Sequence, residues 1–194
     1  MNDFWAENVS RERNDSHKII YAGTFVRRKK LDVLIDCIKK IREEPKYSDL
    51  TLTVVGGDND KGQYMHKIID KNSGFVHFLG KISDKAELMN IYREHSVFAM
   101  PSVHETFGLV YIEALSQNLA LLYTKNEGVD GFFDSSAGVT VDANSSEEII
   151  AALKKLLDDR DSFSNANVDF DNFRWGKLAE RYHRIYSDIV STKE

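Results

Sequence analysis

Apolar residues recur along this chain at two alternating periods. Short runs rich in β-branched and aromatic residues are typical of buried strands, whereas longer stretches with apolar residues three and four apart are typical of amphipathic helices. The short runs predict strands at 18–25, 51–55, 75–79, 97–100, 119–123 and 139–141. The longer stretches predict helices at about 30–43, 64–71, 84–92, from 108 onward, 145–157 and 175–190.

Alternation of strands and helices predicts an α/β domain, a Rossmann-like three-layer domain whose mainly parallel sheet is covered on both faces. We expect residues 1–17 to be a polar N-terminal segment and residues 18–194 to form the domain. Ligands of such sheets bind in the crevice outside the carboxyl ends of the strands. The loops of interest therefore follow Phe25, Val55, Leu79, Met100 and Tyr123.

Composition narrows the class of protein. The chain has 194 residues, of which 42% are hydrophobic and 29% charged, which is ordinary for a soluble globular domain. A net charge of −5 disfavours a nucleic-acid partner. Cys37 is the only cysteine, no apolar run is long enough to span a membrane, and the N-terminus is too polar for a signal peptide. We expect a cytoplasmic protein whose contact with membranes is at most peripheral.

The first loop contains four consecutive cations, residues 27–30, between a strand and a helix start. Cations oppose the helix macrodipole there, so stability alone does not explain them. They suit an anionic ligand such as a diphosphate, and a solvated basic turn is the alternative.

The second loop begins with Gly56, Gly57 and Asp58. Glycines at a strand end allow a ligand to approach the backbone closely, and a plain tight turn is equally compatible with them. The chain contains neither the dinucleotide fingerprint G-x-G-x-x-G nor the phosphate loop G-x-x-x-x-G-K-[ST].

The stretch from Pro101 to Asn118 carries the most chemistry. A helix that begins at Gly108 would point free backbone N–H groups at the binding edge of the sheet, which makes an anion site. Glu105 precedes this helix and Glu113 lies inside it, so that one carboxylate could bind sugar hydroxyls and the other a ribose diol. By spacing alone, an ordinary helix-start acid and a surface acid explain the pair better than a binding site does. His104 could reach the same pocket, and no zinc motif or paired cysteines indicate a metal.

Together these residues resemble the C-terminal domain of retaining glycosyltransferases with two Rossmann-like halves (the GT-B fold), in the group marked by two glutamates separated by seven residues. The likeness runs from about Lys18 to Val190. It rests on Pro101-Ser102, Glu105, 107–110 and Glu113-Ala114, on Gly23, Lys29 and Asp32 in the first turn, on 78–82, and on Phe173 and Trp175 near the end.

The resemblance implies a role for each loop. Lys29 would neutralise the donor diphosphate, Glu105 would contact the transferred sugar, and Glu113 would bind the ribose. Backbone near Lys81 and Ile82 would hold the base, and no metal or other cofactor is implied. The catalytic residues would be Glu105 and Lys29, and the donor-binding set would be Gly23, Thr24, Arg28, Lys29, Gly80, Lys81, Ile82, Glu105, Thr106, Phe107, Gly108, Leu109 and Glu113.

Three features depart from the family pattern. Thr24 stands where many members have arginine, and Arg28 or Lys30 could supply the missing charge. Asn118 and Ala120 replace a common glycine and proline, which we expect to affect only the turn. The family's N-terminal acceptor domain has no counterpart, and residues 1–17 could not replace it.

The expected function follows from the resemblance. The chain would be the donor-binding half of an enzyme that moves a hexose from a UDP- or GDP-sugar to a glycan or lipid-linked acceptor, inactive without the acceptor domain. Half of a nucleotide-sugar epimerase or phosphorylase and a non-catalytic binding module are the alternatives. The apolar side of the last helix is more typical of core than of a partner surface, and its exposure would support a missing domain.

Overall fold

The computed structural model describes residue 1 and residues 3–57 and 63–191. These residues form a six-stranded sheet in which every pairing is parallel, with the strand order β3-β2-β1-β4-β5-β6. All six predicted strands are present. They are β1 (Lys18–Gly23), β2 (Thr51–Gly56), β3 (Val76–Gly80), β4 (Val97–Ala99), β5 (Ala120–Thr124) and β6 (Gly138–Val141).

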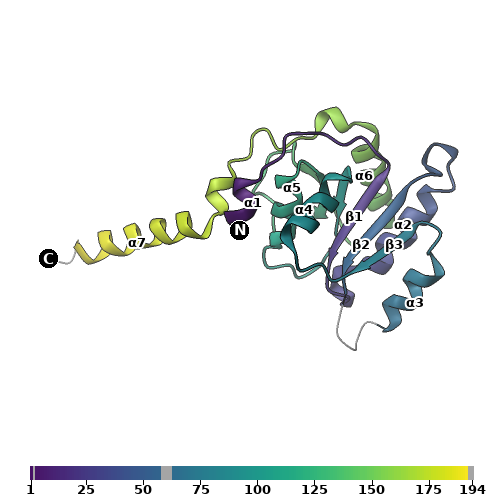
Figure 1. Cartoon of the computed structure of the whole chain (residues 1–194), viewed down its shortest axis with the longest axis horizontal. Coiled ribbons are helices and arrows are strands. Elements are labelled where there is room, and N and C mark those ends of the chain that lie inside the picture. The colour runs from purple at the N-terminus through teal and green to yellow at the C-terminus, as the bar shows by residue number, and fades with distance from the viewer. Residues whose placement is uncertain (2, 58–62, 192–194) are drawn as a thin grey trace.

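Helices cover both faces of this sheet, which confirms the three-layer α/β fold (Figure 1). Asp84 caps its helix as predicted, accepting from the N–H of Glu87 at 2.9 Å, and Ser145 rather than Ser146 caps the sixth helix. The helices are α1 (Asp3–Glu7), α2 (Leu31–Ile41), α3 (Gln63–Lys71), α4 (Lys85–Arg93), α5 (Leu109–Ser116), α6 (Ser146–Asp158) and α7 (Trp175–Ser191).

The strand order reverses between β1 and β4. The chain builds outward from β1 to β2 and β3 and then returns to place β4 on the other side of β1. A crevice opens at such a switch point because the two following loops diverge over opposite faces of the sheet. The loops after β1 and β4 remain joined by a bond from the Val103 N–H to the Arg28 carbonyl at 2.8 Å.

The glycine pair after β2 serves the sheet itself. Gly56 has a φ of +114°, and a Cβ there would lie 2.1 Å from the Gly23 carbonyl oxygen at the end of β1. Gly56 therefore allows the ends of β1 and β2 to approach each other closely. Gly57 continues the contact by donating its N–H to the same oxygen at 3.2 Å, and Asp58 lies outside the described residues.

The N-terminal segment packs onto the domain. Trp5 of α1 is fully buried and meets the ring of Tyr92 edge-on at 5.8 Å. Further along, the backbone of residues 8–12 is held by side chains of Gln117, Asn118 and Asn165, which donate to carbonyls of Asn8, Ser10, Arg11 and Glu12. Although the segment is polar in composition, its residues 8–12 are thus held against the domain by hydrogen bonds.

Asn118 does more than form a turn, which corrects the expectation from the sequence. Its φ of +64° is left-handed, a conformation that glycine and asparagine tolerate best. Its side chain also donates to the carbonyls of Arg11 and Glu12, at 3.1 Å each, and accepts from the N–H of Asn165 at 3.0 Å. An asparagine at this position combines the glycine-like backbone with three anchoring bonds.

We expect Asn118→Ala to destabilise the fold by about 3 kcal/mol, since it removes these bonds and strains the left-handed backbone. Asn118→Gly keeps the backbone conformation and should cost about 1 kcal/mol less. Urea unfolding of the two variants measures the difference. Equal losses would show that the left-handed geometry contributes nothing to the preference for asparagine.

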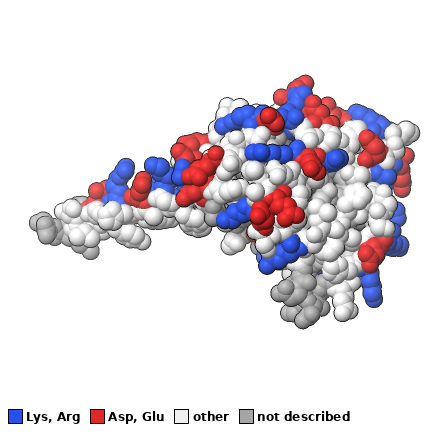
Figure 2. Space-filling view, in the orientation of Figure 1, with Lys and Arg blue, Asp and Glu red and all other residues white. Residues whose placement is uncertain are grey.

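The last helix projects from the body of the domain as a rod, and its apolar side is uncovered (Figure 1). Its charged residues lie along one side and the opposite side is uncharged (Figure 2). The interpretation of this side as core is therefore wrong for the chain by itself, since no residue of α7 is buried. None of the described helices is both long and apolar enough to cross a membrane. The exposed large apolar residues of α7 are Trp175, Tyr182, Ile185, Tyr186, Ile189 and Val190.

Candidate functional site

The loop after β1 brings a lysine into the crevice. Residues Arg27–Lys29 form a single 3-10 turn, and Lys30, with a φ of +53°, redirects the chain into α2. Lys29 is left only 9% exposed, and its ammonium group is paired with the carboxylate of Glu105 from the loop after β4. The structure thus brings together the two residues to which the sequence assigned the central roles.

The Glu105 carboxylate is as enclosed as the lysine. Its side chain is 8% exposed. Besides Lys29, it has Nη1 of Arg28 at 3.8 Å and Oγ of Ser102 at 3.4 Å. A buried carboxylate is tolerated only when cations and hydrogen-bond donors compensate for its lost hydration. The Glu105 carboxylate is therefore an enclosed anion with two cations beside it, Lys29 and Arg28.

Arg28 and Lys30 are the two residues that could replace the arginine absent at Thr24, and only Arg28 points to the crevice. Arg28 donates to the carbonyl of His104 at 3.2 Å, whereas Lys30 is bonded to Oδ1 of Asn144 at 3.0 Å, away from Glu105. Thr24 is exposed, and its carbonyl accepts from the Tyr21 hydroxyl at 3.1 Å. Arg28 is therefore the cation that can replace the charge absent at Thr24.

Helix α5 begins at the crevice immediately after this loop. Gly108 precedes it with a φ of +78°, and a Cβ there would lie 2.6 Å from the ring of Tyr111. The glycine thus lets the loop turn tightly into the helix. The Tyr111 N–H donates to the Gly108 carbonyl at 3.0 Å, so the first-turn N–H groups that could meet an anion are those of Leu109 and Val110. Thr106, Phe107 and Leu109 flank this turn and are exposed or half-buried.

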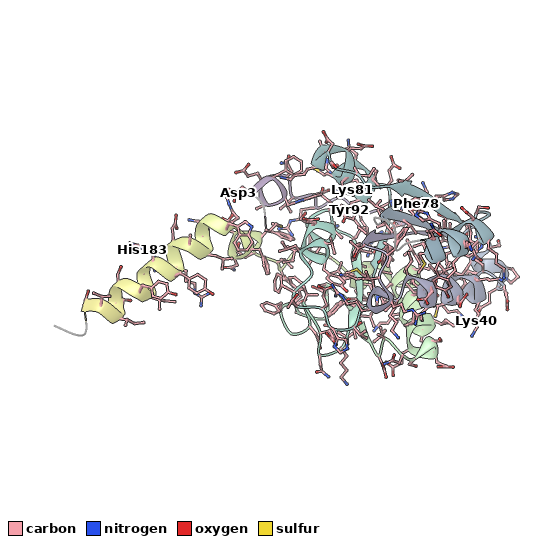
Figure 3. All side chains as sticks on the ribbon, turned by 90° about the horizontal axis from the view of Figure 1, so that it is seen from below. Asp3, Lys40, Phe78, Lys81, Tyr92 and His183 are labelled. Carbon is pink, nitrogen blue, oxygen red and sulfur yellow. The ribbon has the colours of Figure 1, made fainter. Side chains whose placement is uncertain are left out.

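Glu113 occupies a different electrostatic environment from Glu105. It lies on the second turn of α5, where burial raises its pKa, while the Met1 amine and Lys85 at the start of α4 oppose that shift. Glu113 is thus within electrostatic reach of Lys85, which follows the loop that contains Gly80, Lys81 and Ile82. Gly80 is left-handed at a φ of +71°, and Lys81 is exposed beyond Phe78 of β3 (Figure 3).

Glu113 provides a pH-dependent prediction. Because its pKa is raised in the folded chain, ionisation of the carboxylate lowers the free energy of unfolding at neutral pH, and the penalty disappears below the ordinary glutamate pKa, where both states are protonated. We expect Glu113→Gln to raise the melting temperature at pH 7 and to leave it unchanged near pH 4. A stabilisation that is equal at both pH values would contradict an electrostatic cause.

Two residues after β5 escaped sequence reasoning. Glu127 accepts the N–H of Glu105 at 2.9 Å, and the N–H of Gly128 donates to the carbonyl of Glu105 at 3.0 Å. Both lie in one turn, and Glu127 is 22 residues after Glu105. No local pattern marks a glutamate that binds a backbone group this far away, so only the tertiary structure could reveal it.

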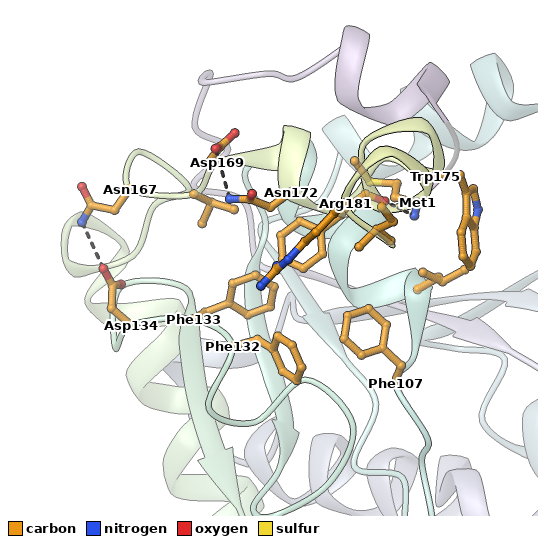
Figure 4. A pocket seen from close by; sticks show the side chains of 14 residues that line it. Met1, Phe107, Phe132, Phe133, Asp134, Asn167, Asp169, Asn172, Trp175 and Arg181 are labelled. Atoms are coloured by element: carbon orange, nitrogen blue, oxygen red, sulfur yellow. Dashed lines mark hydrogen bonds between the residues drawn. The ribbon is translucent and has the colours of Figure 1, made fainter. Parts of the chain in front are cut away.

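An apolar groove of about 790 Å³ opens beside the start of α5 (Figure 4). Phe107 meets Phe132 edge-on at 5.1 Å within it, and Trp175 and Arg181 of α7 border it. Among the described residues, no group of three or more His, Cys, Asp or Glu side chains could hold a metal ion. The groove includes Phe107 and so adjoins the loop that carries Glu105.

Comparison with known proteins places this chain in a family. Residues 5–172 match the family model of the glycosyl transferases group 1. The chain is 27% identical over 179 residues to the D-inositol 3-phosphate glycosyltransferase of Corynebacterium diphtheriae and 31% identical over 193 residues to that of Corynebacterium urealyticum. It covers 42% and 45% of these proteins, which cover 88% and 92% of the chain.

Solved structures share the fold at lower identity. Anabaena HepE in complex with UDP superimposes with a TM-score of 0.74 at 19% identity, over 90% of this chain and 49% of that one. The C-terminal domain of a group 1 glycosyl transferase from Francisella tularensis gives 0.69 at 22% identity, over 81% of this chain and 89% of that domain.

The fold is that of one Rossmann-like half of a GT-B glycosyltransferase. The chain belongs to the glycosyl transferases group 1. It spans about half the length of the curated relatives that it matches.

Proposed function

We propose that the chain is the donor-binding half of a retaining glycosyltransferase that moves a hexose from a UDP- or GDP-sugar to a glycan or lipid-linked acceptor. The observation that carries the proposal is the buried pair of Lys29 and Glu105 at the switch point, immediately before the N-terminus of α5. Fixed positive charge at this place fits a diphosphate, and an adjacent carboxylate fits sugar hydroxyls.

The diphosphate would be stabilised as a leaving group without a metal ion. Breaking the bond between the sugar and the nucleotide places negative charge on the departing phosphate. Lys29, Arg28 and the first-turn amides of α5 are fixed before the reaction, so they lower the energy of that charge without reorganising. When phosphate oxygens engage Lys29, the Glu105 carboxylate is released to accept hydrogen bonds from the hexose.

The nucleoside would extend from the diphosphate toward β3. Glu113 would accept the ribose hydroxyls, and backbone near Lys81 and Ile82 would contact the base. Two proteins of similar fold were solved with such ligands, HepE with UDP and the pneumococcal O-GlcNAc transferase GtfA with UDP and GlcNAc, which supports a nucleotide-sugar as the ligand.

Calorimetric titration with UDP, GDP and ADP tests the proposal directly. We expect one of the three to bind at micromolar to millimolar concentration without added metal and with EDTA present. An absence of binding to all three at millimolar concentration would refute a donor-binding function.

The two glutamates should separate in the same assay. Glu113→Ala is expected to weaken the nucleoside diphosphate about tenfold, because each ribose hydroxyl loses a charged acceptor. Glu105→Ala should weaken the nucleotide-sugar and leave the nucleoside diphosphate nearly unchanged. If Glu113→Ala bound the diphosphate as tightly as the wild type, the ribose would have to lie elsewhere.

We further propose that an acceptor domain completes the enzyme. The chain matches about half of each relative, and the apolar side of α7 lies open next to the groove that contains Phe107. A domain covering both would bury this surface and close the crevice over the donor. Any contact with a membrane would be peripheral, at the cytoplasmic face, and made through that domain.

Without this domain the chain should bind donor and transfer almost no sugar, since the acceptor is not held at the reacting carbon. Transfer that appears when an acceptor domain of the family is added in trans would support the proposal. Continued inactivity with several such domains, in spite of tight donor binding, would favour a non-catalytic binding module.

A further inference from the structure

The turn after β5 supplies a carboxylate that contacts the loop after β4 through the backbone of that loop. Glu127 accepts hydrogen bonds from two consecutive backbone N–H groups, those of His104 and Glu105, the latter at 2.9 Å. These two residues belong to the loop after β4, so the contact crosses between neighbouring loops. The backbone of Glu105 is therefore held from β5 while its side chain is held from β1.

The loop is shaped to receive this carboxylate. His104 has a φ of +55°, which is uncommon for a residue other than glycine and costs about 1–3 kcal/mol when the surroundings impose it. A left-handed residue in a turn can aim successive N–H groups at one point and so form a small anion-binding concavity. Here the chain's own Glu127 fills that concavity, and charge-assisted bonds compensate for the strain.

Gly128 completes the contact on the other side of the same residue. Its N–H donates to the Glu105 carbonyl at 3.0 Å. A Cβ on Gly128 would lie 2.9 Å from the Phe107 carbonyl oxygen and 3.1 Å from Cγ of Glu105. The turn thus binds both peptide groups that flank Glu105 and packs against its side chain.

We propose that Glu127 is a positioning residue for Glu105, and that it determines how well the chain recognises the hexose of the donor while leaving recognition of the nucleotide untouched. The inference rests on the proposed function in one respect, the contact between Glu105 and the sugar. Tying down the backbone of Glu105 limits where its carboxylate can go when Lys29 turns to the diphosphate. A hydrogen-bond acceptor placed within a few tenths of an ångström is what discrimination among hydroxyl groups requires.

The hydrogen bonds that hold Glu127 also lower its pKa, so the carboxylate stays ionised at neutral pH. A glutamine at this position keeps one acceptor oxygen for the backbone N–H groups and loses the charge, whereas an alanine removes both. Comparing the two substitutions therefore separates the contribution of the charge from that of the hydrogen bonds, without changing the size of any residue in the crevice.

The test compares nucleoside diphosphate with nucleotide-hexose binding by calorimetry, using UDP and UDP-glucose or GDP and GDP-mannose. We expect Glu127→Ala to weaken the sugar nucleotide about tenfold, a common effect of removing a group that orients a binding residue, and to change the diphosphate affinity less than about twofold. Glu127→Gln should recover part of the loss. In a Glu105→Ala background, Glu127→Ala should have no further effect.

Glu148→Ala is the matched control, because Glu148 accepts the N–H of Asp142 at 2.8 Å in a turn away from the crevice. Equal weakening of diphosphate and sugar nucleotide by Glu127→Ala would overturn the proposal. So would a full Glu127 effect in the Glu105→Ala background, which would mean direct contact between Glu127 and the ligand.

Hydrogen exchange separates this proposal from the function on which it rests. The amides of His104 and Glu105 should exchange faster in Glu127→Ala than in the wild type, and this readout needs no ligand. If the wild type bound no nucleotide but exchange still accelerated, the proposed function would fail while the contact held. Unchanged exchange at both amides would overturn the positioning role whatever the chain binds.

Discussion

Replacing Lys29 with methionine is expected to weaken the binding of the nucleoside diphosphate by about 100-fold, the largest loss of affinity for any single substitution in this chain. Lys29 is only 9% exposed, and its ammonium group is paired with the Glu105 carboxylate. Its charge is therefore fixed where the phosphates would lie. Methionine keeps the apolar stem and removes the charge, and a desolvated charged contact to phosphate is worth several kcal/mol.

The same substitution should lower the free energy of unfolding by about 3 kcal/mol, because Glu105 loses its main partner while remaining buried. Arg28, with Nη1 at 3.8 Å, compensates for only part of this loss. Adding Glu105→Gln to Lys29→Met should therefore restore stability without restoring nucleotide binding. Calorimetry and urea unfolding measure the two effects separately.

Lys30→Met is the control for this pair, since the adjacent lysine is bonded to Asn144 and points away from Glu105. It should bind the nucleotide within about twofold of the wild type. If Lys29→Met and Lys30→Met lost affinity equally, general attraction by the basic turn would explain binding and no specific contact would be needed.

The largest effect on stability is expected from Gly56→Ala, with a loss of about 4 kcal/mol or more. The new Cβ would meet the Gly23 carbonyl oxygen at 2.1 Å, so the ends of β1 and β2 would have to separate. Because the loop that carries Lys29 starts at the end of β1, we also expect nucleotide affinity to fall in whatever fraction remains folded.

Gly131→Ala is the comparison that isolates the clash. Gly131 is also left-handed, at a φ of +81°, but nothing lies within 4 Å of the position its Cβ would take. Gly131→Ala should lower the free energy of unfolding by only about 1–2 kcal/mol, the cost of holding an alanine in the left-handed conformation. Equal destabilisation of the two variants in urea would mean that backbone conformation, and not the contact between strands, makes Gly56 necessary.

Much of the fold was predictable because burial imposes a period on the sequence. Strands covered on both faces must be apolar throughout, as residues 19–22 are, and helices on a sheet must be apolar on one side. The lysine and the two glutamates were also within reach, since a motif at a strand-to-helix turn implies its place at the carboxyl edge. Their chemistry depended on that place more than on their spacing.

Other parts of the site could not be predicted, because they depend on contacts between segments far apart in the chain. Arg28 and Lys30 are both cations of one basic turn, and only the structure shows that Arg28 is bonded to His104 and Lys30 to Asn144. The bonds from the Asn118 side chain to the N-terminal segment could be recognised only when the position of that segment was known. The apolar period of α7 looks the same whether a helix is packed or, as here, exposed.

The sequence by itself determined the class of fold and the edge of the sheet at which ligands of such folds bind, because periodicity is a local property. Through the family resemblance it also predicted Lys29, Glu105 and Glu113 as the residues that would meet a ligand there. Only the tertiary structure decided that Lys29 and Glu105 neutralise each other in one buried pair, that Arg28 rather than Lys30 joins them, and that Glu127 holds Glu105 in place. These contacts form only in the folded chain, because β1, β4 and β5 bring residues up to 98 positions apart to one edge of the sheet. At that edge the strength of each contact depends on distance and desolvation and not on order along the chain.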